Sequence, residues 1–364
     1  MTLKYHIGAF YYTLQNIPAK FRAKLDSIQI VAIADEEDIA EFGIEALLAD
    51  FLETIAQLAA GIEIELMPNN QHVFHAMLVG LLGDIPAVHY IIGLKEGVGQ
   101  ALRFCRHCFG HGQEIQENFR EDDFQPRTLP LHQAIVNALM AMPEGPAREW
   151  FSTIVGVNGD SVLDIAPHFN LIEMAPQDFM HTVLEGGLSH EMKLYIRYCL
   201  DNFAIDLEEL NRRIDNFNYG FQERSNKPSP IKDAHIDAQG PKLPHQKASQ
   251  LWLLARVLHF LLADIVPEDD PHRQCWELHL RILFAAAAPE VHPNTIDHLA
   301  AAIDEHHQAF TACYPGENIT PKLHFYVHLP SIMLRLASYL FQFFFSNHKK
   351  KKKKIKSNSF KQNN

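Results

Sequence analysis

The chain has little of what several common classes of protein require. It has no Gly-rich phosphate-binding loop, so the sequence does not support nucleotide binding. No window holds the apolar run that a bilayer-spanning helix needs, and the first residues lack the charged and then apolar pattern of a signal peptide. Five cysteines among 364 residues are too few for a disulfide framework, and their odd number indicates a reducing compartment.

Basic charge is also scarce. The formal net charge is −12, and eight of the 32 basic residues are lysines that follow residue 348. The remaining body therefore has 24 basic residues against 44 acidic ones. A body this acidic repels phosphate unless its basic groups cluster or cations neutralise its carboxylates. We therefore expect that any affinity of a parent protein for nucleic acid comes partly from other segments.

The first third of the chain has the pattern of an α/β structure. Residues 5–14 and 28–34 are rich in aromatic and β-branched side chains and predict strands. Apolar residues at helical spacing over 36–60 predict a helix. A third apolar run, 73–82, predicts a strand that ends just before Asp84. The chain thus begins within a predicted strand, which we interpret as a sign of missing upstream sequence.

Helical patterns dominate the rest of the chain, which predicts an α/β beginning with an α-rich continuation. The predicted helical stretches are 131–142, 177–200, 247–265, 274–288 and 295–312. A polar loop with several prolines, at about 219–246, divides them. The Lys-rich tail after Lys349 predicts disorder, and we interpret it as translated unrelated sequence rather than as a nuclear-import or phosphate-binding patch.

One close cysteine pair, Cys105 and Cys108, has the spacing of a metal-binding knuckle. Two thiolates two residues apart can chelate one tetrahedral ion, and a structural zinc site needs two further ligands. His324 and His328 are four residues apart and lie on one face if the segment is helical. The four residues predict a Cys2His2 site that joins distant segments. His111 is a local alternative ligand, and two buried thiols without metal are the other alternative.

Two sets of carboxylates are candidates for chemistry. Asp84 at a strand end would be a hard oxygen ligand for a divalent metal, although Gly-Asp before Ile-Pro is also an ordinary turn. Asp178, His181 and Glu185 share a face if their segment is helical. We interpret that face as a polar, internally hydrogen-bonded helix surface rather than as a catalytic or metal-binding face.

One further histidine pair and the three other cysteines are not predicted to carry chemistry. The pair His306-His307 follows two acidic residues and predicts a solvated helix face. Three cysteines lie in apolar helical patterns and are predicted to be in the core: Cys199, Cys275 and Cys313. None of these residues is predicted to carry chemistry.

Several phrases, in this order, resemble the CACTA (En/Spm) group of DDE DNA transposases, particularly its animal members. They are Lys4 to Leu14, Gly83 to Ala87, Gly93 to Gly99, the pair Cys105 and Cys108, Pro176 to Gly186, Asp270 to His272, and Pro321 to Pro330. The resemblance covers roughly residues 4–336. Each phrase is weak by itself, and their common order carries the resemblance.

The resemblance implies an RNase H-like fold interrupted by a large helical insertion. In this family, two Asp and one Glu hold two Mg²⁺ or Mn²⁺ ions, which activate water and then a DNA 3′-hydroxyl. Asp84 matches the second aspartate, and the pairs Cys105/Cys108 and His324/His328 match the zinc ligands. The implied domains are a partial RNase H-like core at 1–104, the zinc knuckle and helical insertion at 105–320, a return segment at 321–340, and a disordered tail at 341–364.

Two of the three catalytic carboxylates have no match. The first aspartate would precede Lys4, and no Glu or Asp follows His328 where the resemblance puts the glutamate. Asp35 and Glu185 are conceivable substitutes. The prediction is a transposase-derived fragment, truncated at both ends of the catalytic domain and catalytically inactive as it stands.

The resemblance also implies DNA as a partner, an oligomer with an intact transposase, and a nuclear location. Two alternatives remain open. One is a domesticated scaffold that binds DNA or protein. The other is an active metal-dependent nuclease that uses Asp84 with Asp35 or Glu185.

Overall fold

Two strands and a long helix open the computed structural model, which describes residues 7–22, 24–288 and 291–336. Strand β1 (Ile7–Thr13) pairs antiparallel with β2 (Ile28–Asp35), with an irregularity in the register between Phe10 and Tyr11. Helix α2 (Glu36–Ala60) follows β2 directly and packs on the sheet through Phe10 and Val31. The strands expected at 5–14 and 28–34 and the helix expected at 36–60 are therefore confirmed, the first strand over its described residues.

A second two-stranded sheet follows α2. Strands β3 (Ile62–Met67) and β4 (Asn70–Phe74) form an antiparallel hairpin. Asn69 stands in its turn at φ +63°, a left-handed conformation that Asn tolerates better than most residues. The sequence interpretation did not include this hairpin.

The strand predicted at 73–82 is wrong. Only its first two residues belong to β4, and residues 75–84 form no strand. Their backbone makes isolated hydrogen bonds instead: Leu81 N donates to the Met174 carbonyl at 2.8 Å. Leu78 and Leu81 pack against the core. An apolar segment becomes a strand only where a neighbouring strand can pair with its backbone, and none of the described strands pairs with this one.

Helices make up most of the remaining described chain, and they confirm the predicted helical stretches. The first group is α3 (Ile85–Ile91), α4 (Glu114–Glu117), α5 (Leu129–Met140) and α6 (Pro146–Val155). The second group is a π-helix (Met180–Leu188), α7 (Ser189–Asn202), α8 (Leu207–Asn216), α11 (Ala248–Leu262), α12 (Pro271–Ala286) and α13 (Pro293–Cys313).

Short helices complete the second group. The polar loop predicted at 219–246 holds α9 (Gly220–Glu223) and α10 (Asp233–Ile236). Helix α14 (Pro321–His324) continues into a 3-10 turn (Phe325–His328). None of the described helices is both long and apolar enough to cross a membrane.

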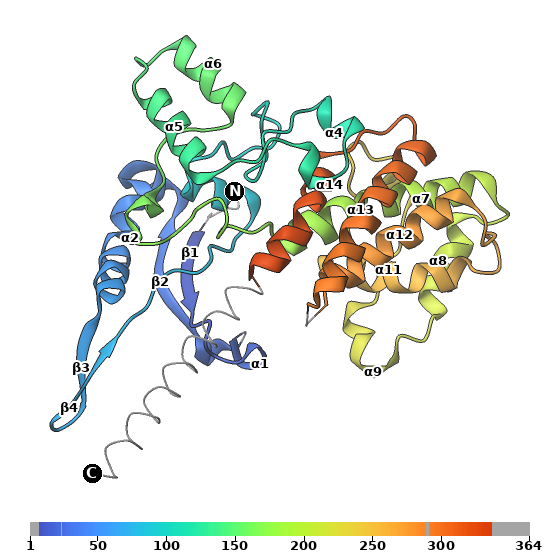
Figure 1. The fold of residues 1–364 in the computed structure, drawn as a ribbon. Coiled ribbons are helices and arrows are strands. Elements are labelled where there is room, and N and C mark those ends of the chain that lie inside the picture. Colours follow the sequence, from blue (N-terminus) through green and yellow to red (C-terminus); the bar gives the residue numbers. More distant parts are fainter. Residues whose placement is uncertain (1–6, 23, 289–290, 337–364) are drawn as a thin grey trace, which may run out of the picture.

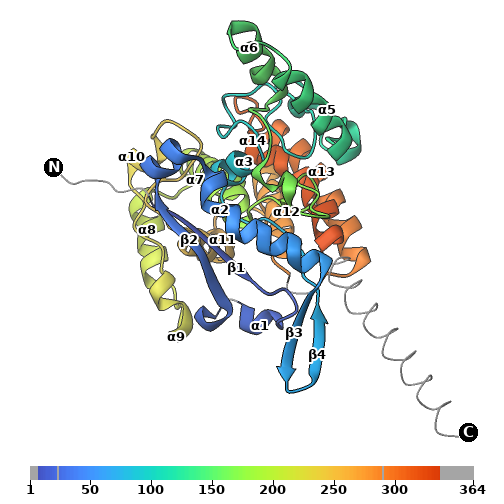
Figure 2. The ribbon, with the colours of Figure 1, turned by 90° about the vertical axis from the view of Figure 1, so that its left-hand side faces the viewer.

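The elements gather around two hydrophobic cores. Figure 1 shows the sheets and α2 on one side of the molecule and the block of α7, α8, α11, α12 and α13 on the other. In Figure 2 the sheets and α2 stand in front of that block. The first core includes Leu52 and Val88, together with Leu139 of α5 and Leu171, whereas Cys105 belongs to the second. The cores thus mix segments from both sides of the predicted boundary at 104/105, and the predicted domains stay a prediction.

The fold is therefore a mixed one, with an α/β beginning and an α-rich continuation, as the sequence predicts. The strands of the described residues form two small antiparallel sheets, each of two strands. Whether these strands represent part of an RNase H-like core stays a prediction.

Candidate metal centre

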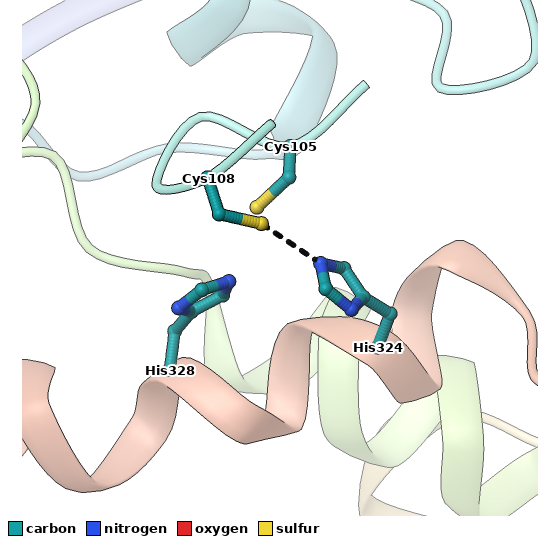
Figure 3. A group of neighbouring side chains, drawn as sticks. All are labelled: Cys105, Cys108, His324 and His328. Atoms are coloured by element: carbon teal, nitrogen blue, oxygen red, sulfur yellow. Dashed lines mark hydrogen bonds between the residues drawn. The ribbon is translucent and has the colours of Figure 1, made fainter. Parts of the chain in front are cut away.

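Two segments that are far apart in the sequence meet in one buried cluster of donor atoms. Cys105 and Cys108 lie on the loop between α3 and α4, and His324 and His328 lie on the helical segment formed by α14 and the 3-10 turn. The two thiols and two imidazoles place one donor atom each within 4.8 Å of all the others. Figure 3 shows both rings on the same side of their helix, facing the sulfur atoms.

Local sequence holds each pair in place. The Thr320 hydroxyl accepts from Leu323 N at 3.3 Å and caps α14, so that His324 and His328 follow one turn apart. On the loop, His107 N donates to the Cys105 sulfur and Gly110 N donates to the Cys108 sulfur, both at 3.4 Å. Such N–H donors stabilise thiolates.

Gly110 is required by the close approach of the two segments. A Cβ atom at this position would lie 2.9 Å from the Phe124 ring and 3.3 Å from the His324 ring. Only a residue without a side chain therefore lets the cysteine loop come this close to His324.

One carboxylate outside the cluster orients an imidazole. Nδ1 of His328 lies 2.8 Å from Oε1 of Glu121, which also accepts from the Ser331 hydroxyl. The Nδ1–H group therefore donates to the carboxylate, and Nε2 points into the cluster. That Nε2 atom is buried and has no hydrogen-bond partner in the part of the chain that the structure describes. A histidine held in this way by a carboxylate is typical of metal ligands.

The residues fit a zinc ion by chemistry and by spacing. The Cys108 sulfur and His324 Nε2 are 3.3 Å apart. Ordinary Zn–S and Zn–N bonds in tetrahedral geometry separate two such atoms by about 3.6 Å. Two sulfurs and two imidazole nitrogens form a closed set, which is typical of structural zinc rather than of catalytic zinc. The cluster could therefore hold a metal ion such as zinc.

Electrostatics favour the thiolate form at one of the two cysteines, Cys105, whereas hydrogen bonding with Cys105 and burial raise the pKa of Cys108. Burial opposes a charged thiol, but hydrogen bonding with Cys108 and the nearby His328 hold the pKa of Cys105 well below its usual value. Burial likewise opposes a charged imidazole, but Cys105 and Glu121 outweigh it and raise the pKa of His328 to about 9. In the protein without metal, His328 and Cys105 therefore form an imidazolium–thiolate pair. A zinc ion bound here would take the place of the positive charge of the imidazolium.

The local alternative ligand does not take part. Nε2 of His111 lies 3.5 Å from Glu114 and is not among the four donors. The polar face at Asp178 is hydrogen-bonded internally, since the Asp178 carboxylate contacts Nδ1 of His181. Glu185 forms an ion pair with Lys242 at 3.5 Å.

Asp84 caps a helix rather than ending a strand. Its Oδ1 accepts from Ala87 N at 2.8 Å at the start of α3, and the side chain is exposed. Asp35 immediately precedes α2, where its side chain makes no capping hydrogen bond. Within the described ranges, no group of three metal-ligating side chains contains Asp84, Asp35 or Glu185.

The prediction of a solvated face at His306 and His307 is wrong, because both side chains are buried, with 0% and 1% of their surface exposed. They continue the buried stripe of α13 between Ile303 and Phe310. Of the predicted core cysteines, Cys199 and Cys275 are buried and Cys313 is half-buried.

Sequence reasoning missed two carboxylates, Glu121 beside the cluster and the fully buried Glu191 on α7. No protein-family model matches the chain, and no curated protein matches it either.

Proposed function

We propose that this chain is a transposase-derived protein whose distant segments are joined by a structural zinc ion, and that by itself it does not catalyse phosphoryl transfer. The observation that carries the proposal is the Cys105, Cys108, His324 and His328 cluster, fully buried and built from the residues that resemble the zinc ligands of CACTA-type transposases. The RNase H-like core, the DNA partner, the association with an intact transposase and the nuclear location come from that resemblance alone.

The placement of the carboxylates supports the lack of catalysis. Two-metal phosphoryl transfer needs several carboxylates around the same pair of ions. Asp84 is the one match to the family's catalytic residues, and its carboxylate already caps α3. Neither Asp35 nor Glu185 forms a group of three ligands with Asp84 in the described part of the chain. The geometry therefore gives no support to the nuclease alternative.

A zinc ion held by all four donors of the cluster, which we call the zinc clamp, also favours a binding role over a hydrolytic one. Four protein ligands leave no open position for water, so this metal would hold segments together rather than activate a nucleophile. A scaffold that binds DNA or protein through the helical block is the second candidate function, and the buried cluster of two cysteines and two histidines is the observation that favours it.

A cleavage assay with Asp84 variants tests the main proposal. The purified chain with Mg²⁺ or Mn²⁺ should neither nick nor join DNA above background, and Asp84→Asn should behave like the parent protein. Asp84→Ala should lower the free energy of unfolding by ~1 kcal/mol, whereas Asp84→Asn should have little effect, because Asn also caps helices well. Metal-dependent cleavage that Asp84→Asn abolishes would overturn the proposal.

A further inference from the structure

A second buried cluster of metal-type donors lies inside the helical block. Glu191 comes from α7, Cys275 from α12 and His306 from α13, and their donor atoms all lie within 4.8 Å of one another. The side chains of Glu191 and His306 have no exposed surface, and Cys275 is 0% exposed. No residue of the first cluster takes part.

Hydrogen bonds fix the tautomer of His306. Nε2 of His307 lies 3.0 Å from the Leu323 carbonyl oxygen, so this nitrogen carries a hydrogen and donates it. A neutral His307 ring with its hydrogen on Nε2 has an acceptor at Nδ1. Nδ1 of His306, 3.0 Å away, must then be the donor. In this tautomer the lone pair of His306 lies on Nε2.

That lone pair faces a carboxylate. Nε2 of His306 is 2.6 Å from Oε2 of Glu191, and two lone pairs at this distance repel each other unless a cation or a proton lies between them. Burial removes the water that would otherwise hydrate the carboxylate. The second oxygen of Glu191, Oε1, is buried and has no hydrogen-bond partner among the described residues. A thiol, Cys275, completes the donor set.

The same carboxylate has a second imidazole neighbour. Nδ1 of His279 lies 2.5 Å from Oε2 of Glu191, and its Nε2 lies 3.0 Å from the Tyr326 hydroxyl. His279 thus orients Glu191 in the way that Glu121 orients His328 at the first cluster. Ligands supported by such outer hydrogen bonds are typical of metal sites.

We propose that Glu191, Cys275 and His306 bind a second divalent transition-metal ion of the zinc class, independently of the function proposed above. A carboxylate, a thiolate and a neutral imidazole with one divalent ion make an electrically neutral group, which a buried site tolerates best. Mixed oxygen, sulfur and nitrogen donors suit zinc, a borderline-soft ion. Binding displaces the thiol proton of Cys275 and opens the Glu191–His306 contact to about 3.3 Å.

The ion would join three helices of the block and connect them to the first cluster. Glu191, Cys275 and His306 lie on α7, α12 and α13 respectively. The relay from His306 through His307 ends on the carbonyl of Leu323, the residue before the ligand His324. The Cys313 thiol contacts Cys275, and the His279 imidazole contacts Glu191, so each adjoins one of the three proposed ligands.

Metal counting tests the proposal. The full chain, purified after growth with zinc, should contain two zinc ions per molecule by elemental mass spectrometry. Cys275→Ala and Glu191→Gln should each retain one. Cys199→Ala removes another buried cysteine of the block, outside both clusters, and should retain two.

Cobalt substitution of the parent protein gives an answer that does not depend on the folding of a variant. Thiolate-to-cobalt absorption should report three thiolates per chain in two titration steps, two from the first cluster and one from Cys275. A parent protein that binds a single ion with two thiolates would overturn the proposal. So would a second ion that Cys275→Ala leaves in place, because that ion would lie elsewhere.

Discussion

At the scale of single residues, Glu121 fixes the orientation of the His328 ring, so that Nε2 faces the metal site. Its carboxylate accepts from Nδ1 of His328 at 2.8 Å and so keeps Nε2 directed into the cluster. We expect Glu121→Gln to weaken zinc binding by about 10- to 100-fold, as the loss of such an outer partner typically does. Competition with a chromogenic chelator measures the affinity. Glu117→Gln, an exposed neighbour on α4, is the matched control, and equal affinities for the two variants would contradict the role of Glu121.

Two buried histidines that are donors in neither cluster predict sensitivity to acid. Burial, assisted by nearby arginines, lowers the pKa of His89 and of His132 from 6.5 to about 4. Both are neutral in the folded protein, whereas the unfolded chain takes up their protons below pH 6.5. The contribution of the two histidines to the free energy of unfolding is therefore complete above about pH 6.5. It is lost as the pH falls toward 4, by up to ~3 kcal/mol for each histidine.

Denaturant unfolding at pH 7 and pH 5 measures this effect. His132→Gln should reduce the loss of unfolding free energy between the two pH values, whereas His298→Gln, at an exposed position, should leave it unchanged. Acid also disturbs the metal clusters. The comparison between variants isolates the part of the pH dependence that comes from His132. An unchanged pH dependence in His132→Gln would remove His132 from the explanation.

The sequence identifies the four donors of the first cluster but not the groups around them. A C-x2-C pair and an H-x3-H pair have spacings that imply chelation. Glu121 is 207 residues from His328, and no local pattern connects them. The two acids before His306 predict a solvated face. Its spacing from Ile303 and Phe310, however, matches the buried stripe of α13.

At the scale of elements, the π-helix must pass close to the histidine-bearing segment. A Cβ atom at Gly187 would lie 2.4 Å from the Tyr326 hydroxyl oxygen and 2.7 Å from a Leu323 methyl group. We expect Gly187→Ala to lower the free energy of unfolding by ~1–3 kcal/mol, as overpacking does, and to weaken zinc binding because α14 must move. Gly112→Ala, where a Cβ atom would meet no other atom within 4 Å, should have no effect on either.

Local patterns predicted the helices well and the strand pairing poorly. Helical spacing of apolar residues reports which face is buried, and a helix satisfies its own backbone, so α2, α11, α12 and α13 follow from sequence. Strands need a partner elsewhere, so the apolar run at 73–82 gave a wrong strand. Alternation in residues 62–66 followed by Pro68-Asn69 is a hairpin signal that the sequence does contain. The π-helix gives no such signal, because its spacing resembles that of an ordinary helix.

At the scale of the whole molecule, the first cluster belongs to one of the two cores. Cys105, Cys108 and Leu323 pack in the core of the helical block, and the core around α2 and α5 contains none of the four donors. Cys108 and His324 are separated by 216 residues, so a metal there restricts a very long stretch of the unfolded chain. Loss of this restraint should therefore destabilise the helical block more than the α/β beginning.

Amide hydrogen exchange with and without a chelator measures this difference. Removing the metal should speed exchange in α13 and α14 and leave α5 close to its rate in the untreated protein, since zinc binding contributes free energy to the part of the fold that its ligands join. Cys105→Ala should reproduce the effect without chelator, which separates the first cluster from any other ion. Equal acceleration in α5 and α13 would mean that the two cores unfold as one unit, whereas unchanged exchange in both would mean that the cluster contributes no stability. The predicted pattern requires that the zinc clamp stabilises the helical block and that the core around α2 holds together without it.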